Sequence, residues 1–202
     1  MIRILIVLVA VLISSSTMNA QGVKTLEGDI SKLIGEKELS VTFSYENMMV
    51  HGFNSEEEFI EAKVRLREEH KPGTGEGERF RGSWFADRDS VFEPAFIKYI
   101  NHKLPKKRKI NVVENNPDAT YNLHVQTLWT YPGYNVGFAQ PAKIEVALSL
   151  YEISNPDVIL WKAKNPYRVE AGIAPYKREL RIAAAYAKLS LNISWFFKRK
   201  LK

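Results

Sequence analysis

The stretch from Tyr121 to Trp161 constrains the fold more than any other part of this 202-residue sequence. Apolar and polar side chains alternate from Tyr121 to Trp129 and again from Lys143 to Leu150, which is the period-two pattern of half-buried strands. A segment rich in proline and glycine separates the two runs, and a turn and a further apolar run follow them. The pattern predicts a long β-hairpin with one more strand attached, and a sheet that is covered on one face only.

The remaining sequence predicts helices before and after this hairpin. The expected elements are a strand at 41–45, a helix capped by Ser55 and running to His70, a helix at 91–104, a strand at 110–113 and a last helix from Pro175 towards Lys198. Residues 71–90 contain four glycines and are expected to be irregular. The order β-α-α-β-β-β-β-α predicts an α+β fold, a two-layer sandwich with a mixed or mostly antiparallel sheet of about five strands and helices on one face.

A single core is expected between the sheet and the helices. Its predicted members are Phe43, Leu123, Val125, Val146, Leu148 and Leu180. The last helix is expected to face this core through an apolar stripe at helical spacing, formed by Leu180, Ala184, Ala187, Leu191 and Trp195.

The N-terminal residues have the organisation of a secretory signal peptide. Arg3 precedes an unbroken apolar run at 4–13, and small or polar residues follow up to Ala20. The run is about half as long as the roughly 20 residues that a membrane span needs, so cleavage after Ala20 is expected. We therefore expect a signal peptide at 1–20, an N-terminal arm at 21–39 and a single α+β domain at 40–202.

The absence of cysteine and the modest charge limit the functions that can be expected. No cysteine is available for lipid modification, so the exported protein is not expected to be a lipoprotein. The expected location is the periplasm or the cell surface. A formal net charge of +6 is modest, and together with export it argues against a nucleic-acid partner.

No motif in the sequence predicts catalysis or metal binding. The four histidines, which are His51, His70, His102 and His124, lack the close spacing of a zinc site. The Gly-x-Ser-x-Gly motif is absent, as is a cysteine nucleophile. The glycine run at 73–77 is interpreted as a surface loop, because the glutamates beside it would repel a phosphate. No catalytic residue, metal or cofactor is therefore predicted.

Two groups of residues are candidates for contacts with other molecules. The aromatic side chains of the hairpin turn could bind a partner or a glycan, or could fold back over the sheet edge; they are Trp129, Tyr131, Tyr134 and Phe138. The C-terminal residues are candidate membrane-surface contacts; they are Phe196, Phe197, Lys198, Arg199 and Lys200. The interpretation favoured for this end is a core-packing Trp195 followed by a solvated basic tail.

Several segments together resemble a family of small exported, uncharacterised proteins of Gram-negative envelopes. They are Gly28-Asp29-Ile30, VTFSYENMMV at 41–50, the segment at 72–96, the segment at 115–137 and RIAAAYAKLS at 181–190. The Tyr-x-Leu-x-Val strand and the closing helix rich in alanine are more distantly similar to envelope lipoproteins with a two-layer α/β domain. The resemblance implies a fold and a compartment, and it supplies no catalytic residues.

These observations favour an exported, non-enzymatic binding or scaffolding module. Its partner would be an envelope protein or a glycan, with peripheral membrane contact as a further expectation. The alternative is a hydrolase-type enzyme whose site is assembled from Asp87, Asp89, Glu114 and His124.

Overall fold

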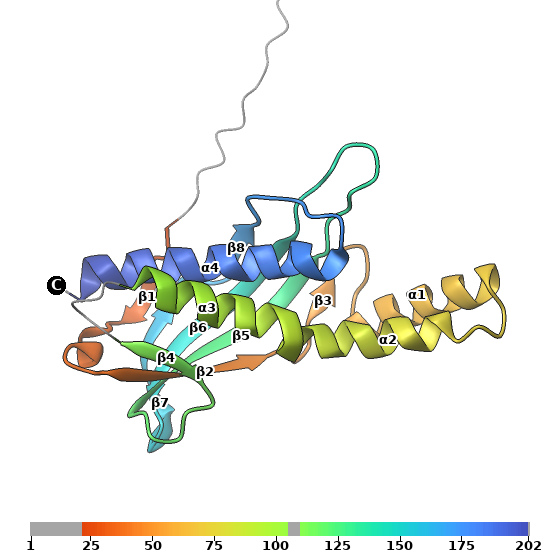
Figure 1. Ribbon diagram of the computed structural model, residues 1–202. Coiled ribbons are helices and arrows are strands. Elements are labelled where there is room, and N and C mark those ends of the chain that lie inside the picture. The colour runs from red at the N-terminus through yellow and green to blue at the C-terminus, as the bar shows by residue number, and fades with distance from the viewer. Residues whose placement is uncertain (1–21, 105–109, 202) are drawn as a thin grey trace, which may run out of the picture.

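The computed structural model describes residues 22–104 and 110–201, and a mixed sheet of eight strands lies at its centre (Figure 1). The strands are β1 (Thr25–Gly28), β2 (Glu38–Ser44), β3 (Met49–Val50), β4 (Asn111–Glu114), β5 (Tyr121–Tyr131), β6 (Lys143–Glu152), β7 (Asn155–Ala163) and β8 (Tyr167–Glu170). The helices are α1 (Glu56–His70), α2 (Glu76–Asp87), α3 (Glu93–Lys103) and α4 (Arg178–Lys200), with the short helical segments η1 (Ser31–Leu33) and η2 (Arg88–Phe92). The predicted α+β class is confirmed.

The sheet contains more strands than the five that the sequence predicts. β1, β3 and β8 are only two to four residues long and lie at the margins of the sheet, so they carry too little alternation to be recognised in the sequence. β1 belongs to the predicted N-terminal arm, and it pairs antiparallel with β7. The arm therefore contributes an edge strand to the sheet. The signal peptide predicted at 1–20 lies outside the described residues.

β5 is the central strand, and its neighbours set the two faces of the sheet. It pairs parallel with β2 and β3 and antiparallel with β6. The register aligns Val41 with Leu123 and Leu123 with Leu150, so these side chains share one face. Figure 1 shows α3 and α4 side by side across this face, whereas α1 and α2 form a hairpin that projects away from the sheet. The core lies between the sheet and α3 and α4.

The core contains most of the predicted residues, but not Leu180. Leu123, Val125, Val146 and Leu148 are buried, and Phe43 is half-buried against them. Leu180 and Trp195 are exposed, so the predicted stripe of α4 is wrong. The buried stripe is the neighbouring one, which contains the larger apolar side chains; its members include Ile182, Tyr186, Leu189, Ile193, Phe196 and Phe197.

Phe196 and Phe197 are therefore core residues and not membrane-surface contacts. Phe196 packs against Trp161 of β7, with ring centroids 5.2 Å apart and the ring planes tilted by 30°. Both phenylalanine side chains are almost completely buried. Lys198 is half-buried, whereas Arg199 and Lys200 are exposed. The basic end of α4 thus lies beyond the two phenylalanine residues that dock it on the sheet.

The segment at 71–90, predicted to be irregular, contains the whole of α2. α1 begins as the sequence predicts, since Ser55 Oγ accepts a hydrogen bond from the backbone N–H of Glu58 at 3.1 Å. α2 then packs back on α1, and Gly77 makes this close approach possible, because a Cβ atom there would lie only 2.8 Å from Val64 Cγ1. The glycines that suggested a loop therefore begin and pack a helix: Gly75 takes a left-handed φ of 68° at its N-terminus.

Candidate binding site

An aromatic recess lies on the face of the sheet that is turned away from α3 and α4. Side chains alternate between the two faces along a strand, and an irregularity between Thr127 and Trp129 resets this alternation in β5. As a result, Thr127 points towards α4, where its hydroxyl group bonds that of Tyr186 at 2.6 Å. Trp129 and Tyr131 face the other way and lie opposite Glu145 and Lys143 of β6.

Six residues from four parts of the chain line the recess, which has a volume of about 370 Å³. They are His51, Trp129, Tyr131, Gln140, Lys143 and Arg168. The ring of His51 meets that of Tyr131 edge to face with centroids 4.9 Å apart, and it meets the ring of Trp129 in the same way at 5.7 Å. β3, which pairs with β5 through Met49 and Trp129, brings His51 to this place.

Lys143 and Arg168 of the recess are each paired with a neighbouring carboxylate, so the local charge is balanced. Lys143 Nζ lies 3.2 Å from Glu170 Oε2, and Arg168 pairs with Glu145. The Arg168 guanidinium also lies 5.5 Å from the centroid of the Trp129 ring, and Lys143 Nζ lies 6.0 Å from that of Tyr131. The ion pairs hold the aromatic rings in place and leave hydrogen-bonding groups beside them.

The structure divides the four predicted aromatic binding residues into two pairs. Trp129 and Tyr131 line the recess. Tyr134 and Phe138 lie in the following loop, and both are exposed. Sequence reasoning missed His51, Gln140, Lys143 and Arg168. The sequence carries a signal for Lys143 and Arg168, because both belong to runs of alternating residues. It carries no such signal for His51, because the neighbouring strand β3 is only two residues long.

The residues of the alternative hydrolase site are not brought together around His124, although Glu114 and Asp89 both lie near Glu93 on the helix-covered face. His124 lies on the helix-free face, where Thr42 Oγ1 bonds its Nδ1 at 3.0 Å and Ser44 Oγ bonds its Nε2 at 3.1 Å. Burial lowers the pKa of His124. Asp87 pairs with Arg178 of α4, and Glu114, which is in register with Val41, lies on the helix-covered face. His124 and Glu114 are therefore separated by the sheet.

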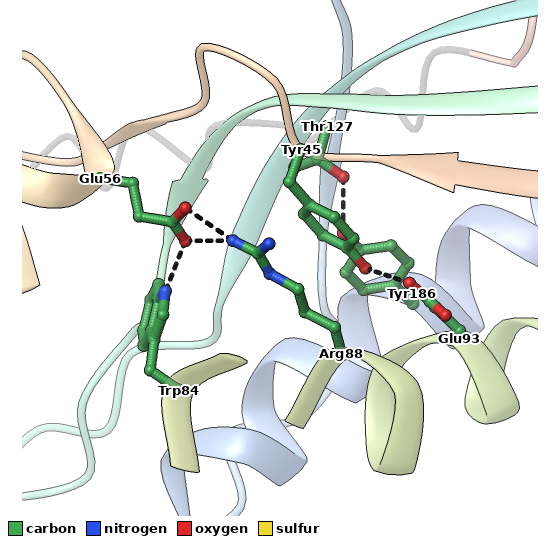
Figure 2. A network of polar contacts seen from close by, with 7 residues as sticks. All are labelled: Tyr45, Glu56, Trp84, Arg88, Glu93, Thr127 and Tyr186. Atoms are coloured by element: carbon green, nitrogen blue, oxygen red, sulfur yellow. Dashed lines mark hydrogen bonds and ion pairs between the residues drawn. The ribbon is translucent and has the colours of Figure 1, made fainter. Parts of the chain in front are cut away.

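A buried polar network lies on the helix-covered face (Figure 2). Tyr45 Oη donates a hydrogen bond to Glu93 Oε1 at 3.0 Å. Burial, followed by the charges of Glu114 and Asp89, raises the pKa of Glu93 from 4.5 to about 7. Burial also raises the pKa of Tyr186 to about 12. Glu93 therefore retains a proton at pH values at which most carboxyl groups are ionised.

Beside Glu93, a second part of the network joins the projecting helices to the core (Figure 2). Glu56 of α1 accepts hydrogen bonds from Trp84 Nε1 of α2 and from the Arg88 guanidinium of η2 at 2.5 Å each. The Arg88 guanidinium lies 4.1 Å from the centroid of the Tyr45 ring. The hollow lined by these residues has a volume of about 10 Å³, which is the space of about one water molecule. This network is therefore structural, with no room for a substrate.

Among the described residues, no group of three or more histidine, cysteine, aspartate or glutamate side chains could hold a metal ion. No helix within residues 22–104 and 110–201 is long and apolar enough to cross a membrane. The described residues form an α+β domain with an aromatic recess of about 370 Å³ on an uncovered sheet face.

Comparisons with known proteins add little to this assignment. No family model and no curated protein matches the sequence. Among solved structures, the chain is similar to the PelC dodecamer from Paraburkholderia phytofirmans, with 12% sequence identity, a TM-score of 0.41 and coverage of 84% of this chain and 96% of that chain. A methionine-substituted variant of that dodecamer gives 12% identity, a TM-score of 0.39 and coverage of 85% and 95%. Similarity at this level assigns neither a family nor a function.

Proposed function

We propose that this protein is an exported envelope protein that acts as a non-enzymatic binding module, and that its ligand is a glycan held in the aromatic recess. The observation that carries the proposal is the position of Trp129 and Tyr131 beside charged and amide groups on an uncovered sheet face. Export and membership of the Gram-negative envelope family remain part of the proposal, supported by the sequence of residues 1–20 and by the resemblance described above.

The chemistry of the recess suits a sugar. A sugar ring has one face of C–H groups, which packs on aromatic rings, and a rim of hydroxyl groups, which exchange hydrogen bonds. Here the rings of Trp129 and Tyr131 supply the apolar surface, and the side chains of Gln140, Lys143 and Arg168 supply donors at its edge. Glu145 and Glu170 supply acceptors and balance the charge, so the recess suits a neutral or weakly charged sugar.

The recess is also preorganised. The edge-to-face contacts of His51 and the two cation–aromatic contacts restrain the rings before any ligand arrives. A ligand that stacks on restrained rings loses less free energy to ordering of the protein. The proposed role needs none of the residues of the alternative hydrolase site.

The proposal is tested by screening the protein on an array of bacterial glycans and titrating the strongest ligand by calorimetry. Trp129→Ala should weaken binding about 30-fold or more, as expected for a central aromatic contact that contributes about 2 kcal/mol or more. Tyr99→Ala is the control, because Tyr99 is an exposed aromatic residue on α3, away from the recess, and this variant should bind like the parent. Equal binding by the parent and Trp129→Ala would refute the site, and cleavage of the glycan by the parent would refute the non-enzymatic role.

A further inference from the structure

Two uncharged loops lie side by side at one end of the molecule and expose bulky apolar side chains. The loops at 132–142 and 171–176 contain no acidic or basic residue. Figure 1 shows both of them beside the start of α4, with the longer loop between β5 and β6 projecting beyond the sheet. We call the exposed side chains of these loops the loop tip; they are Tyr134 (44% exposed), Val136 (82%), Phe138 (88%), Ile173 (63%) and Tyr176 (81%).

The backbone of the loop tip is held together from inside the protein. Arg181 of α4 is almost completely buried, and its guanidinium donates to the carbonyl oxygens of Pro132 at 3.0 Å, Gly133 at 3.2 Å and Pro175 at 3.1 Å. It also donates to the carbonyl oxygen of Tyr176. One side chain therefore satisfies two carbonyl groups in each loop and fixes the loops to each other.

Two further contacts complete this framework. Asn135 Nδ2 of the longer loop donates to the carbonyl oxygen of Ala174 in the shorter loop at 2.8 Å. The backbone groups of Tyr134 and Gln140 exchange two hydrogen bonds, at 3.1 Å and 2.8 Å. The loops thus present apolar side chains on a backbone in which many polar groups already have partners.

We propose that the loop tip inserts into the surface of a lipid bilayer and attaches the protein to it peripherally. Exposed apolar side chains of this size on a water-soluble surface mark a contact site. A loop can enter the interfacial region only if its backbone groups find partners there, and Arg181 and Asn135 supply them from within the protein. Tyrosine is an amphipathic residue suited to the level of the lipid headgroups, where Tyr134 and Tyr176 would lie.

The charge around the loop tip supports a lipid surface as its occupant. Neither loop carries a carboxylate that anionic lipid would repel, and the exposed Lys177 follows the shorter loop directly. The tip also projects from the protein, so it presents side chains outward, as insertion requires, and does not form a groove for a peptide. The loop tip adjoins the proposed glycan site, because Gln140 belongs to the longer loop and lines the recess, but the proposed lipid contact uses other side chains.

The absence of cysteine allows a direct test of insertion. Phe138→Cys in the full chain is labelled with an environment-sensitive dye and mixed with vesicles of phosphatidylcholine, with and without phosphatidylglycerol. The dye emission should shift to shorter wavelength and should be quenched by nitroxide-labelled lipid. Val158→Cys on β7 is the control, since Val158 is 50% exposed and lies outside the tip, and its signal should not change.

A second measurement does not depend on the label. Phe138→Ser should lower the partition coefficient onto vesicles in sedimentation about 10-fold or more, which corresponds to the loss of one buried phenylalanine side chain. Val158→Ser should not lower the partition coefficient. Residues 1–21 are the same in all the proteins compared, so they cannot cause a difference between them. Unchanged emission at position 138 with both kinds of vesicle, or equal partitioning of Phe138→Ser and the parent, would overturn the proposal. An emission shift that follows protein concentration without vesicles would overturn it in favour of self-association.

Discussion

Replacing Glu93 with glutamine should make the protein more stable above pH 7 and should change its stability little in acid. Glu93 is the first residue of α3, and its carboxyl group is buried where Tyr45 donates a hydrogen bond to it. The charges that face it are those of Glu114 on β4 and Asp89 on η2, both of which oppose its ionisation. A glutamine has nearly the same shape and still offers an oxygen to Tyr45, so the substitution removes mainly the charge.

The magnitude and its sign follow from the difference in pKa between the two states. The pKa is 4.5 in an ordinary glutamate and about 7 for Glu93 in the fold, so the folded protein binds more protons than the unfolded chain between these values. The stability that protonated Glu93 gives to the fold is therefore fully present below pH 4.5, and it is lost as the pH rises through 7 and the carboxyl group ionises. Since each pKa unit corresponds to about 1.4 kcal/mol, we expect ionised Glu93 to destabilise the fold by up to about 3 kcal/mol above pH 7.

The assay is urea unfolding of the parent and Glu93→Gln at about pH 4 and about pH 8. The variant should gain up to about 3 kcal/mol over the parent at the higher pH and almost nothing at the lower. Glu61→Gln is the control, since Glu61 is exposed on α1, and its difference from the parent should not depend on pH. A Glu93→Gln variant whose advantage is the same at both pH values, or which is less stable at high pH, would refute the reasoning.

Two further pairs of variants test the packing. Leu148→Ala should cost about 2–5 kcal/mol in urea unfolding, because Leu148 is buried, whereas Leu180→Ala should cost less than about 0.5 kcal/mol; equal losses would mean that the face of α4 or β6 is misassigned. Gly77→Ala should lower the free energy of unfolding by about 1–3 kcal/mol, since its Cβ would meet Val64, whereas Gly82→Ala has open space and should gain up to about 1 kcal/mol; a stabilising Gly77→Ala would contradict the close packing of α1 on α2.

The sequence predicts those parts of the fold in which a local residue pattern fits only one type of secondary structure. β5 and β6 follow from alternation, β7 from an apolar run after a turn, and α1 from the Ser55 cap, because each of these signals lies within a few neighbouring residues. α2 is different. Its glycines lower its helix propensity, and only the presence of α1 shows that Gly77 is a packing position.

The error in α4 has a related cause. Two neighbouring faces of this helix carry apolar residues at helical spacing, one with Leu180 and Trp195 and the other with Tyr186 and Phe196. Spacing alone cannot choose between them. The second face is the buried one, because Phe196 packs against Trp161 and the hydroxyl group of Tyr186 bonds that of Thr127. Both partners lie on strands far away in the sequence.

The recess shows why the candidate site could be predicted only in part. Trp129 and Tyr131 belong to one strand, and alternation places both on one face once the irregularity after Thr127 is known. Lys143 joins them because β6 pairs antiparallel with β5, and Arg168 joins them because β8 pairs antiparallel with β6. These strands follow one another closely along the chain, which favours such pairing. His51 arrives by a parallel pairing of β3 with β5 across three helices, a contact with no local signal. The residues of the recess that belong to the hairpin can therefore be predicted from the sequence, whereas the others depend on the topology of the sheet.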